Sequence, residues 1–226
     1  MKLKQALERL RESGTEQNRK IYPRHGVKGE MYGVSFANLG KLQKEIRTDH
    51  QLAEGLWASG NHDARILATM IADGGKLTSK ELDAWAKDLD NYVIADAFSK
   101  MVARSQFVKE KTEKWTASKN EWIGRVGWAL IYYLTKDKKL EDAFFEPFLQ
   151  TIEFEIHQRK NKTRDAMNMA LIAIGTRNGF LQKQALMVAD KIGKVEVDHG
   201  ETSCKTPDAT EYILKTVERR KGKATG

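Results

Sequence analysis

Two short groups of aromatic and charged residues could carry chemistry in this sequence. Tyr92 and Asp96 are four residues apart in a largely apolar segment, so a helix would place a ring and a carboxylate on one side, one turn apart. Trp122 and Arg125, three residues apart, form a second such pair. A carboxylate can stabilise a developing positive charge or align a water molecule, and a guanidinium can bind a phosphate. The alternative is a buried ion pair between Asp96 and Arg125, packed by aromatic rings.

The residues that other reaction classes need are missing. The sequence has no glycine-rich phosphate loop and no serine nucleophile elbow. Its five histidines show no pair at metal-ligand spacing, so we expect no metal. Residues 198–204 collect several possible ligands, but we interpret them as an ordered surface loop. We therefore expect no nucleotide and no other cofactor.

Charge and hydropathy indicate the kind of partner. The net charge of +8 and the pI near 9.4 suit a polyanion, either a nucleic acid or an anionic membrane surface. A basic protein without such a partner is the alternative. No segment approaches the roughly 20 apolar residues of a membrane span, and the N-terminus lacks the apolar core of a signal peptide. With the single cysteine Cys204 excluding an internal disulfide, the sequence predicts a cytoplasmic protein without membrane contact.

The elements that would position these residues are helices. Only three prolines interrupt a sequence rich in helix formers, and leucines at helical spacing predict a helix over residues 3–13. Phe36, Leu39, Leu42 and Ile46 share one face of another predicted helix, and Asp49 is a predicted cap for the next. We expect the tryptophans and methionines to be mostly core. The pairs Tyr132–Tyr133 and Phe144–Phe145 are predicted to pack between helices.

Three segments of the chain resemble one another, over residues 64–71, 124–131 and 163–172. Each follows a polar turn, has an arginine in its first turn, and continues as an apolar run. These arginines, Arg65, Arg125 and Arg164, lie 60 and then 39 residues apart, so the first interval would span two repeats, with a helix near residues 90–104 between them. Helix pairs at a period of about 30–40 residues are typical of an α-solenoid. A compact helical bundle is the alternative.

The predicted architecture is a single all-α domain over residues 1–226, a solenoid of HEAT-like helical repeats. Its second helices would line a concave basic face. A charge run predicts that about residues 215–226 form a frayed or disordered tail. Basic residues at helix starts and adjoining turns are candidates for phosphate contacts, although a solvated surface charge is the alternative for each lysine. They are Arg65, Lys119, Lys162, Arg164 and Arg177.

The order and spacing of Tyr92-x-x-x-Asp96 and Trp122-x-x-Arg125 resemble the core pattern of the AlkD-like DNA alkylation repair enzymes. The resemblance covers roughly residues 20–195 and includes Tyr22. Members of this family are HEAT-repeat DNA glycosylases that excise positively charged N3- and N7-alkylpurines. The resemblance therefore implies a DNA repair glycosylase that hydrolyses N-glycosidic bonds in double-stranded DNA with alkylated bases. We expect it to act as a monomer.

The resemblance also implies roles for individual residues. Asp96 matches a family aspartate at the lesion, and Arg125 matches an arginine from the next repeat. Tyr92 stands where a tryptophan is usual, and Tyr22 matches a tyrosine at the DNA-facing surface. Met169 stands where a second tryptophan is usual, which removes an aromatic wall. The resemblance thus makes Asp96, Tyr92 and Arg125 the catalytic candidates, with Trp122, Met169 and Tyr22 at the DNA surface.

One carboxylate can suffice for this reaction. Ordinary glycoside hydrolysis uses two, one of them protonating the leaving group, but a cationic base needs no such acid. The resemblance further implies that the base is not swung into a deep pocket, unlike in most glycosylases. Two other functions remain open: a non-catalytic protein that binds branched or distorted DNA, which Met169 favours, and a scaffold for peptides, which would show no salt-sensitive DNA binding.

Overall fold

The computed structural model describes residues 1–224 of the protein. Within these residues the chain forms thirteen α-helices and three 3-10 helices, with no β-strand beyond one isolated bridge between Gly14 and Val34. The all-α prediction is confirmed. No helix in the described residues combines the length and the apolar character that crossing a bilayer requires.

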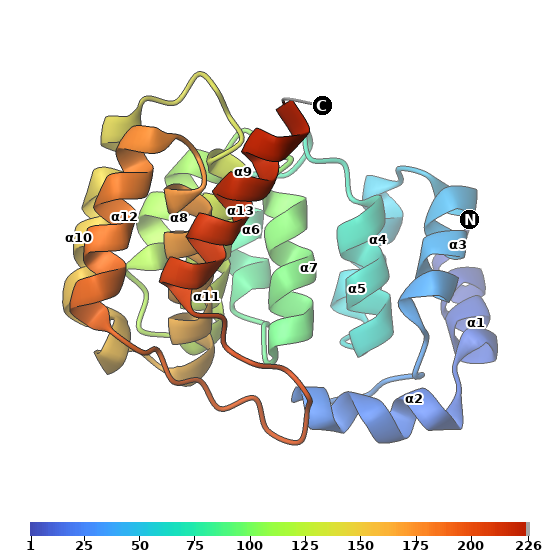
Figure 1. Cartoon of the computed structure of the whole chain (residues 1–226). Coiled ribbons are helices and arrows are strands. Elements are labelled where there is room, and N and C mark those ends of the chain that lie inside the picture. The colour runs from blue at the N-terminus through green and yellow to red at the C-terminus, as the bar shows by residue number, and fades with distance from the viewer. Residues whose placement is uncertain (225–226) are drawn as a thin grey trace. The chain divides into compact units, whose positions relative to one another are not determined.

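Packing divides the chain into two compact units. The first comprises residues 1–108 together with residues 200–202. Its α-helices, labelled in Figure 1, are α1 (Leu3–Ser13), α2 (Glu16–Ile21), α3 (Phe36–Ile46), α4 (His50–Ala58), α5 (His62–Ile71), α6 (Ser79–Ala86) and α7 (Tyr92–Val102). The 3-10 helix η1 (Tyr22–His25) follows α2.

The second unit comprises residues 109–199 and the described residues from 203 onward. Its elements are α8 (Val108–Thr116), α9 (Glu121–Leu134), η2 (Asp142–Phe144), α10 (Glu146–Glu155), η3 (Ile156–Gln158), α11 (Asn161–Gly175), α12 (Gly179–Ile192) and α13 (Ala209–Ala224). A helix-free segment over residues 193–208 connects α12 to α13.

Helix pairs recur along the chain as the sequence predicts. The second helices of successive pairs are α5, α7, α9 and α11, which begin roughly 30 to 40 residues apart. Because α7 begins between α5 and α9, the interval from Arg65 to Arg125 does span two repeats. The predicted helix near residues 90–104 is α7, the helix that carries Tyr92 and Asp96.

An asparagine cap starts three of these four helices. Asn61, Asn91 and Asn120 each accept hydrogen bonds through Oδ1 from two backbone N–H groups of the first turn. Such caps satisfy donors that a helix start leaves unpaired. The fourth helix, α11, follows Lys160 and has no side-chain cap.

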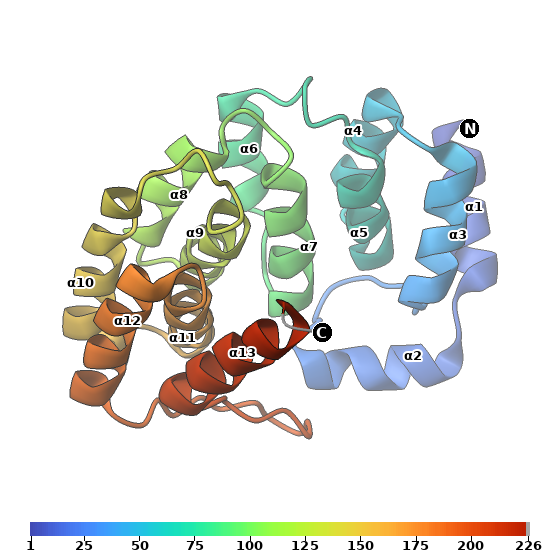
Figure 2. The same ribbon diagram turned by 45° about the horizontal axis from the view of Figure 1, so that its top comes forward.

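Aromatic side chains and close backbone contacts build the two cores. In the first unit, α5 packs against α3, α4 and α7, and Trp57 stacks on Trp85 with ring centroids 4.5 Å apart. In the second, α11 packs against α9, α12 and α13, and α12 lies beside α10 and α13 in Figure 1 and Figure 2. A Cβ at Gly127 would lie 2.4 Å from the backbone nitrogen of Thr116, so this glycine permits the close approach of α8 and α9.

Two expectations differ from the structure. Tyr132 is 50% exposed rather than packed between helices, although Tyr133 is half-buried. Residues 215–224 belong to α13 rather than to a disordered tail, and residues 225–226 of the predicted tail lie outside the described residues.

Candidate functional site

A buried carboxylate fixes the segment that precedes α3 in the first unit. Asp63, in the first turn of α5 and 1% exposed, accepts hydrogen bonds from the backbone N–H groups of Tyr32, Gly33 and Val34 at 2.6, 2.9 and 2.9 Å. Gly33 has a φ of +78°, and a Cβ there would lie 2.7 Å from the backbone oxygen of Thr15. Only a glycine fits this turn without strain.

Tyr22 uses this anchored segment as its hydrogen-bond partner. Its hydroxyl donates to the backbone oxygen of Val34, and its ring meets the buried His62 edge to face, with centroids 6.0 Å apart. Burial and the Asp63 carboxylate raise the pKa of the Tyr22 hydroxyl, which therefore stays protonated. Burial lowers the pKa of His62, which favours its neutral form.

Tyr92 is held by a histidine that the sequence interpretation did not select. The Tyr92 hydroxyl hydrogen-bonds to Nδ1 of His25, and the two rings meet edge to face with centroids 5.9 Å apart. His25 ends η1, three residues after Tyr22. The clustering of Tyr22, Arg24 and His25 beside Pro23 was the available signal, but the distance of 67 residues to Tyr92 hides the contact.

Asp96 presents its side chain to solvent from α7, one helical turn after Tyr92. The neighbouring Ala95 and Phe98 are completely buried, so the helix is fixed while Asp96 stays exposed. The helix start is equally well fixed, because Asn91 is fully buried and caps it.

Arg125 on α9 is held within the second unit. Its guanidinium donates to the carboxylate of Asp165 at 2.8 Å and to the backbone oxygen of Lys162 at 3.1 Å. The side chains of Arg125 and Asp165 are 11% and 17% exposed, so the pair has a defined orientation. The neighbouring Trp122 is half-buried, and Lys119 is exposed in the turn before α9.

Arg65 and Arg164, each in the first turn of its helix, make equivalent hydrogen bonds. Each donates from Nε to a backbone oxygen eight residues earlier, of Trp57 and Ile156 respectively. Arg65 also donates to the backbone oxygen of Asp88, and Arg164 to three further backbone oxygens. Both side chains therefore fasten the preceding segment to the repeat, whereas the sequence predicts that they contact phosphate.

Arg177 is likewise committed inside the second unit. Its guanidinium donates to the Asp142 carboxylate at 3.3 Å and to the backbone oxygens of Thr135, Asp137 and Leu140. The side chain is 10% exposed. This network connects Arg177 to the loop between α9 and α10, and its predicted phosphate contact stays a prediction.

Met169 and Lys162 complete the predicted set. Met169 on α11 is 44% exposed, so a thioether side chain is presented to solvent at this position. Lys162 donates from Nζ to the backbone oxygen of Asp198 at 2.8 Å. This contact and those of Asn161 with Asp198 hold the predicted surface loop against the start of α11.

One cluster in the described residues has the side chains to hold a metal ion. Ligand atoms of His50, Glu54 and Glu81 lie within 4.8 Å of one another. Glu81 already caps α6, because Oε2 accepts from the backbone N–H and the hydroxyl of Thr78 at 2.8 and 2.6 Å. The hydrogen bond from Thr78 lowers the pKa of Glu81. The cap explains this cluster without an ion.

The repeated helix pairs define an all-α, HEAT-like repeat protein. A family model described as "DNA alkylation repair enzyme" matches residues 4–213. The chain belongs to this DNA alkylation repair enzyme family.

Similar proteins extend over nearly the whole chain. An uncharacterized protein of Listeria innocua is 28% identical over 211 residues, which cover 88% of this chain and 90% of that one. An uncharacterized protein of Listeria monocytogenes is 27% identical over 213 residues, covering 89% and 91%. A solved structure with 27% identity superposes with a TM-score of 0.88 over 97% of this chain and 95% of that one. It represents a family related to the HEAT-like repeat DNA glycosylases with affinity for branched DNA structures.

Proposed function

We propose that this protein is a DNA glycosylase that releases cationic N3- and N7-alkylated purines. The observation that carries the proposal is the exposed carboxylate of Asp96 on a helix fixed at its start, one turn after Tyr92. Family membership supports the general function in alkylation repair. The +8 net charge supports a polyanionic substrate.

The chemistry requires one anionic group beside the sugar. An alkylated purine already bears a positive charge, so breaking the bond between its ring nitrogen and C1′ leaves a neutral base. The bonding electrons go with the base, and the sugar becomes oxocarbenium-like. The Asp96 carboxylate would stabilise that cation and accept the proton of the attacking water.

Tyr92 would contact the damaged nucleotide with its ring. Face contacts between an aromatic ring and a cation contribute about 0.5–2 kcal/mol. The hydrogen bond between Tyr92 and His25 fixes the tilt of the Tyr92 ring, so the ring can position a bound nucleotide. We assign His25 as a positioning residue that acts through Tyr92.

Arg125 would supply a phosphate contact from the second unit. Its Asp165 partner orients the planar guanidinium, and the planar fork of a guanidinium suits binding to phosphate oxygens. The exposed Lys119 in the same turn region adds charge. Arg65, Arg164 and Arg177 donate to backbone oxygens, so we propose that they chiefly hold the fold.

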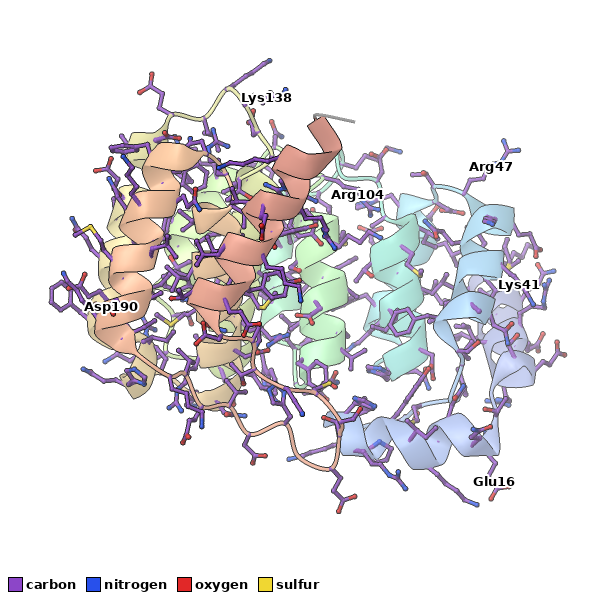
Figure 3. All side chains as sticks on the ribbon, viewed as in Figure 1. Glu16, Lys41, Arg47, Arg104, Lys138 and Asp190 are labelled. Atoms are coloured by element: carbon purple, nitrogen blue, oxygen red, sulfur yellow. The ribbon has the colours of Figure 1, made fainter. Side chains whose placement is uncertain are left out.

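Single-turnover release of 7-methylguanine from methylated duplex tests the role of Asp96. We expect Asp96→Asn to lower the rate by about a hundredfold or more, as loss of a positioned base does, while duplex affinity stays within twofold. Asp190→Asn, which changes an exposed aspartate on α12 (labelled in Figure 3), is the matched control and should act like the wild type. Equal rates for the wild type and Asp96→Asn would refute the assignment.

A second candidate function is non-catalytic binding of branched DNA. Met169, 44% exposed where the resembled family has an aromatic residue, favours it, as does the solved relative with affinity for branched structures. A competition assay between a four-way junction and linear duplex, run beside the base-release assay, separates the candidates. Strong junction preference without base release would support this second function.

A further inference from the structure

The second unit carries a groove of about 730 Å³ between the end of α9, the later half of α11 and one face of α13. We call it the α13 groove. Its volume falls within the range of sites that enclose a small organic ligand. Its lining residues are Tyr132, Thr135, Lys136, Lys138, Met169, Ile172, Ala173, Thr176, Arg177, Asn178, Tyr212, Thr216, Arg219 and Arg220.

The charge of the α13 groove has one sign. Five lining residues are lysine or arginine, and none is aspartate or glutamate. Arg177 is neutralised by Asp142, but Lys138 and Arg219 form no ion pair within the part of the chain that the structure describes. Lys138 extends from the loop after α9, as Figure 3 shows. The groove is therefore suited to an anion.

Exposed apolar surface lies among these cations. Tyr132, Tyr212 and Met169 are 50%, 48% and 44% exposed. The Lys136 ammonium lies 3.8 Å from the centroid of the Tyr132 ring, which brings a cation and an aromatic face to the same place. Aromatic faces beside backbone-tracking cations are the features by which proteins bind single-stranded nucleic acids.

One face of α13 lines the groove, and packing holds the helix in that orientation. Tyr212, Thr216, Arg219 and Arg220 recur at helical spacing and all line the groove. The buried Ile213 seats the helix on α11, because a Cβ at Gly175 would lie 2.6 Å from its Cδ1. Arg220 also donates to the backbone oxygen of Thr176 at the end of α11. The groove is thus part of the folded second unit.

We propose that the α13 groove binds unpaired nucleotides of DNA, with bases stacked on Tyr132 and Tyr212 and phosphates held by Lys136, Lys138 and Arg219. Unpaired bases fit because the faces of a paired base are covered by its neighbours in the duplex. The inference rests on the DNA binding of the proposed function but not on base release. It names the part of a branched or locally opened substrate that the second unit recognises.

Affinity measurements on three DNA probes test the groove. The probes are a single-stranded oligonucleotide, a fully paired duplex, and a duplex with an unpaired flap that carries 2-aminopurine. Stacking of a base on a tyrosine ring contributes to the binding free energy. Tyr132→Leu and Tyr212→Leu should therefore each weaken binding of the single strand and of the flap about tenfold. Duplex affinity should stay within twofold, and the wild type should quench the 2-aminopurine more than either variant does.

Matched variants outside the groove show whether the loss of any exposed aromatic or basic residue weakens DNA binding. Phe154→Leu and Phe180→Leu change aromatic residues that are 72% and 54% exposed outside the groove, and both should bind all probes like the wild type. Arg219→Glu should weaken flap binding far more than Lys183→Glu, which changes an exposed lysine of α12. Thermal unfolding checks that every variant is folded.

Four outcomes would overturn the inference. The first is unchanged flap affinity in the tyrosine variants, and the second is an equal loss of affinity for flap and paired duplex. A third outcome is that the groove binds an acidic peptide through these tyrosines and does not bind single-stranded DNA. That result would assign the groove to a protein partner. A wild type that releases 7-methylguanine but binds no single strand would refute the groove alone. Single-strand binding without base release would refute only the glycosylase.

Discussion

At the scale of single residues, the structure divides the charged side chains into those exposed to solvent and those that hold the fold. Asp96 and Lys119 are exposed, whereas Asp63, Arg65, Arg164 and Arg177 satisfy internal hydrogen bonds. Residue type alone does not distinguish these roles. A recurring arginine in a basic protein suits phosphate binding, but two of the three recurring arginines bind backbone oxygens eight residues earlier.

The His25–Tyr92 contact gives a prediction at this scale. Tyr92→Phe and His25→Phe each remove the hydrogen bond between the two side chains, so each should lower the free energy of unfolding by roughly 1 kcal/mol. The double variant should lose about as much as one single variant, because the same bond is removed once. Urea denaturation measures all four proteins. Fully additive losses would show that the two side chains are not coupled.

His62 gives a pH-dependent prediction. Burial lowers its pKa in the folded protein, so as pH falls the unfolded chain binds the proton first. The stability contributed by neutral His62 is therefore present above the ordinary pKa of about 6.5 and is lost as pH falls below it. Between pH 7 and 5.5 the free energy of unfolding should decrease more steeply in the wild type than in His62→Gln. Parallel slopes in urea denaturation would contradict this.

At the scale of elements, the asparagine caps and apolar runs made the repeat predictable. The second helix of each pair begins near a polar turn, and Asn61 and Asn120 lie in the turns recognised from the sequence. The helix that carries Asp96 has the same cap, Asn91. The extent of α13 was not predictable from its charge run, because Ala209 and Ile213 alone are buried among the side chains described on that helix.

Substitution of Asp63 tests whether α5 holds residues 32–34 in place. Asp63→Asn replaces a carboxylate that accepts three backbone N–H groups and directs an amide N–H toward donors. We expect a loss of about 2–3 kcal/mol in the free energy of unfolding, measured by urea denaturation. Asp73→Asn, at a carboxylate with one exposed bond to Gly75, should lose less than about 1 kcal/mol. Similar small losses in both variants would mean that Asp63 does not anchor residues 32–34.

At the scale of the whole molecule, composition and family agree on a polyanionic partner. The chain carries a net charge of +8 and belongs to the DNA alkylation repair enzyme family. The sequence pattern was enough to predict the helical repeat and to select Tyr92 and Asp96. It did not reveal His25 or the α13 groove, because both depend on contacts between residues far apart in the chain.

Net charge leads to a prediction about salt. If about four phosphates are neutralised, DNA affinity should fall by roughly a hundredfold between 50 and 200 mM salt. Fluorescence anisotropy with a labelled duplex measures this dependence. A binding constant that does not change with salt would favour the peptide-binding scaffold instead.

We propose that the Asp96 carboxylate promotes departure of a base that is already cationic. Mass spectrometry of the free bases released from DNA treated with several alkylating agents measures this departure. The wild type should release N3- and N7-alkylpurines, neutral O-alkylated bases should stay in the DNA, and Asp96→Asn should release almost none. Absence of every alkylpurine from the wild-type reaction, in a preparation that binds the same DNA, would contradict this proposal.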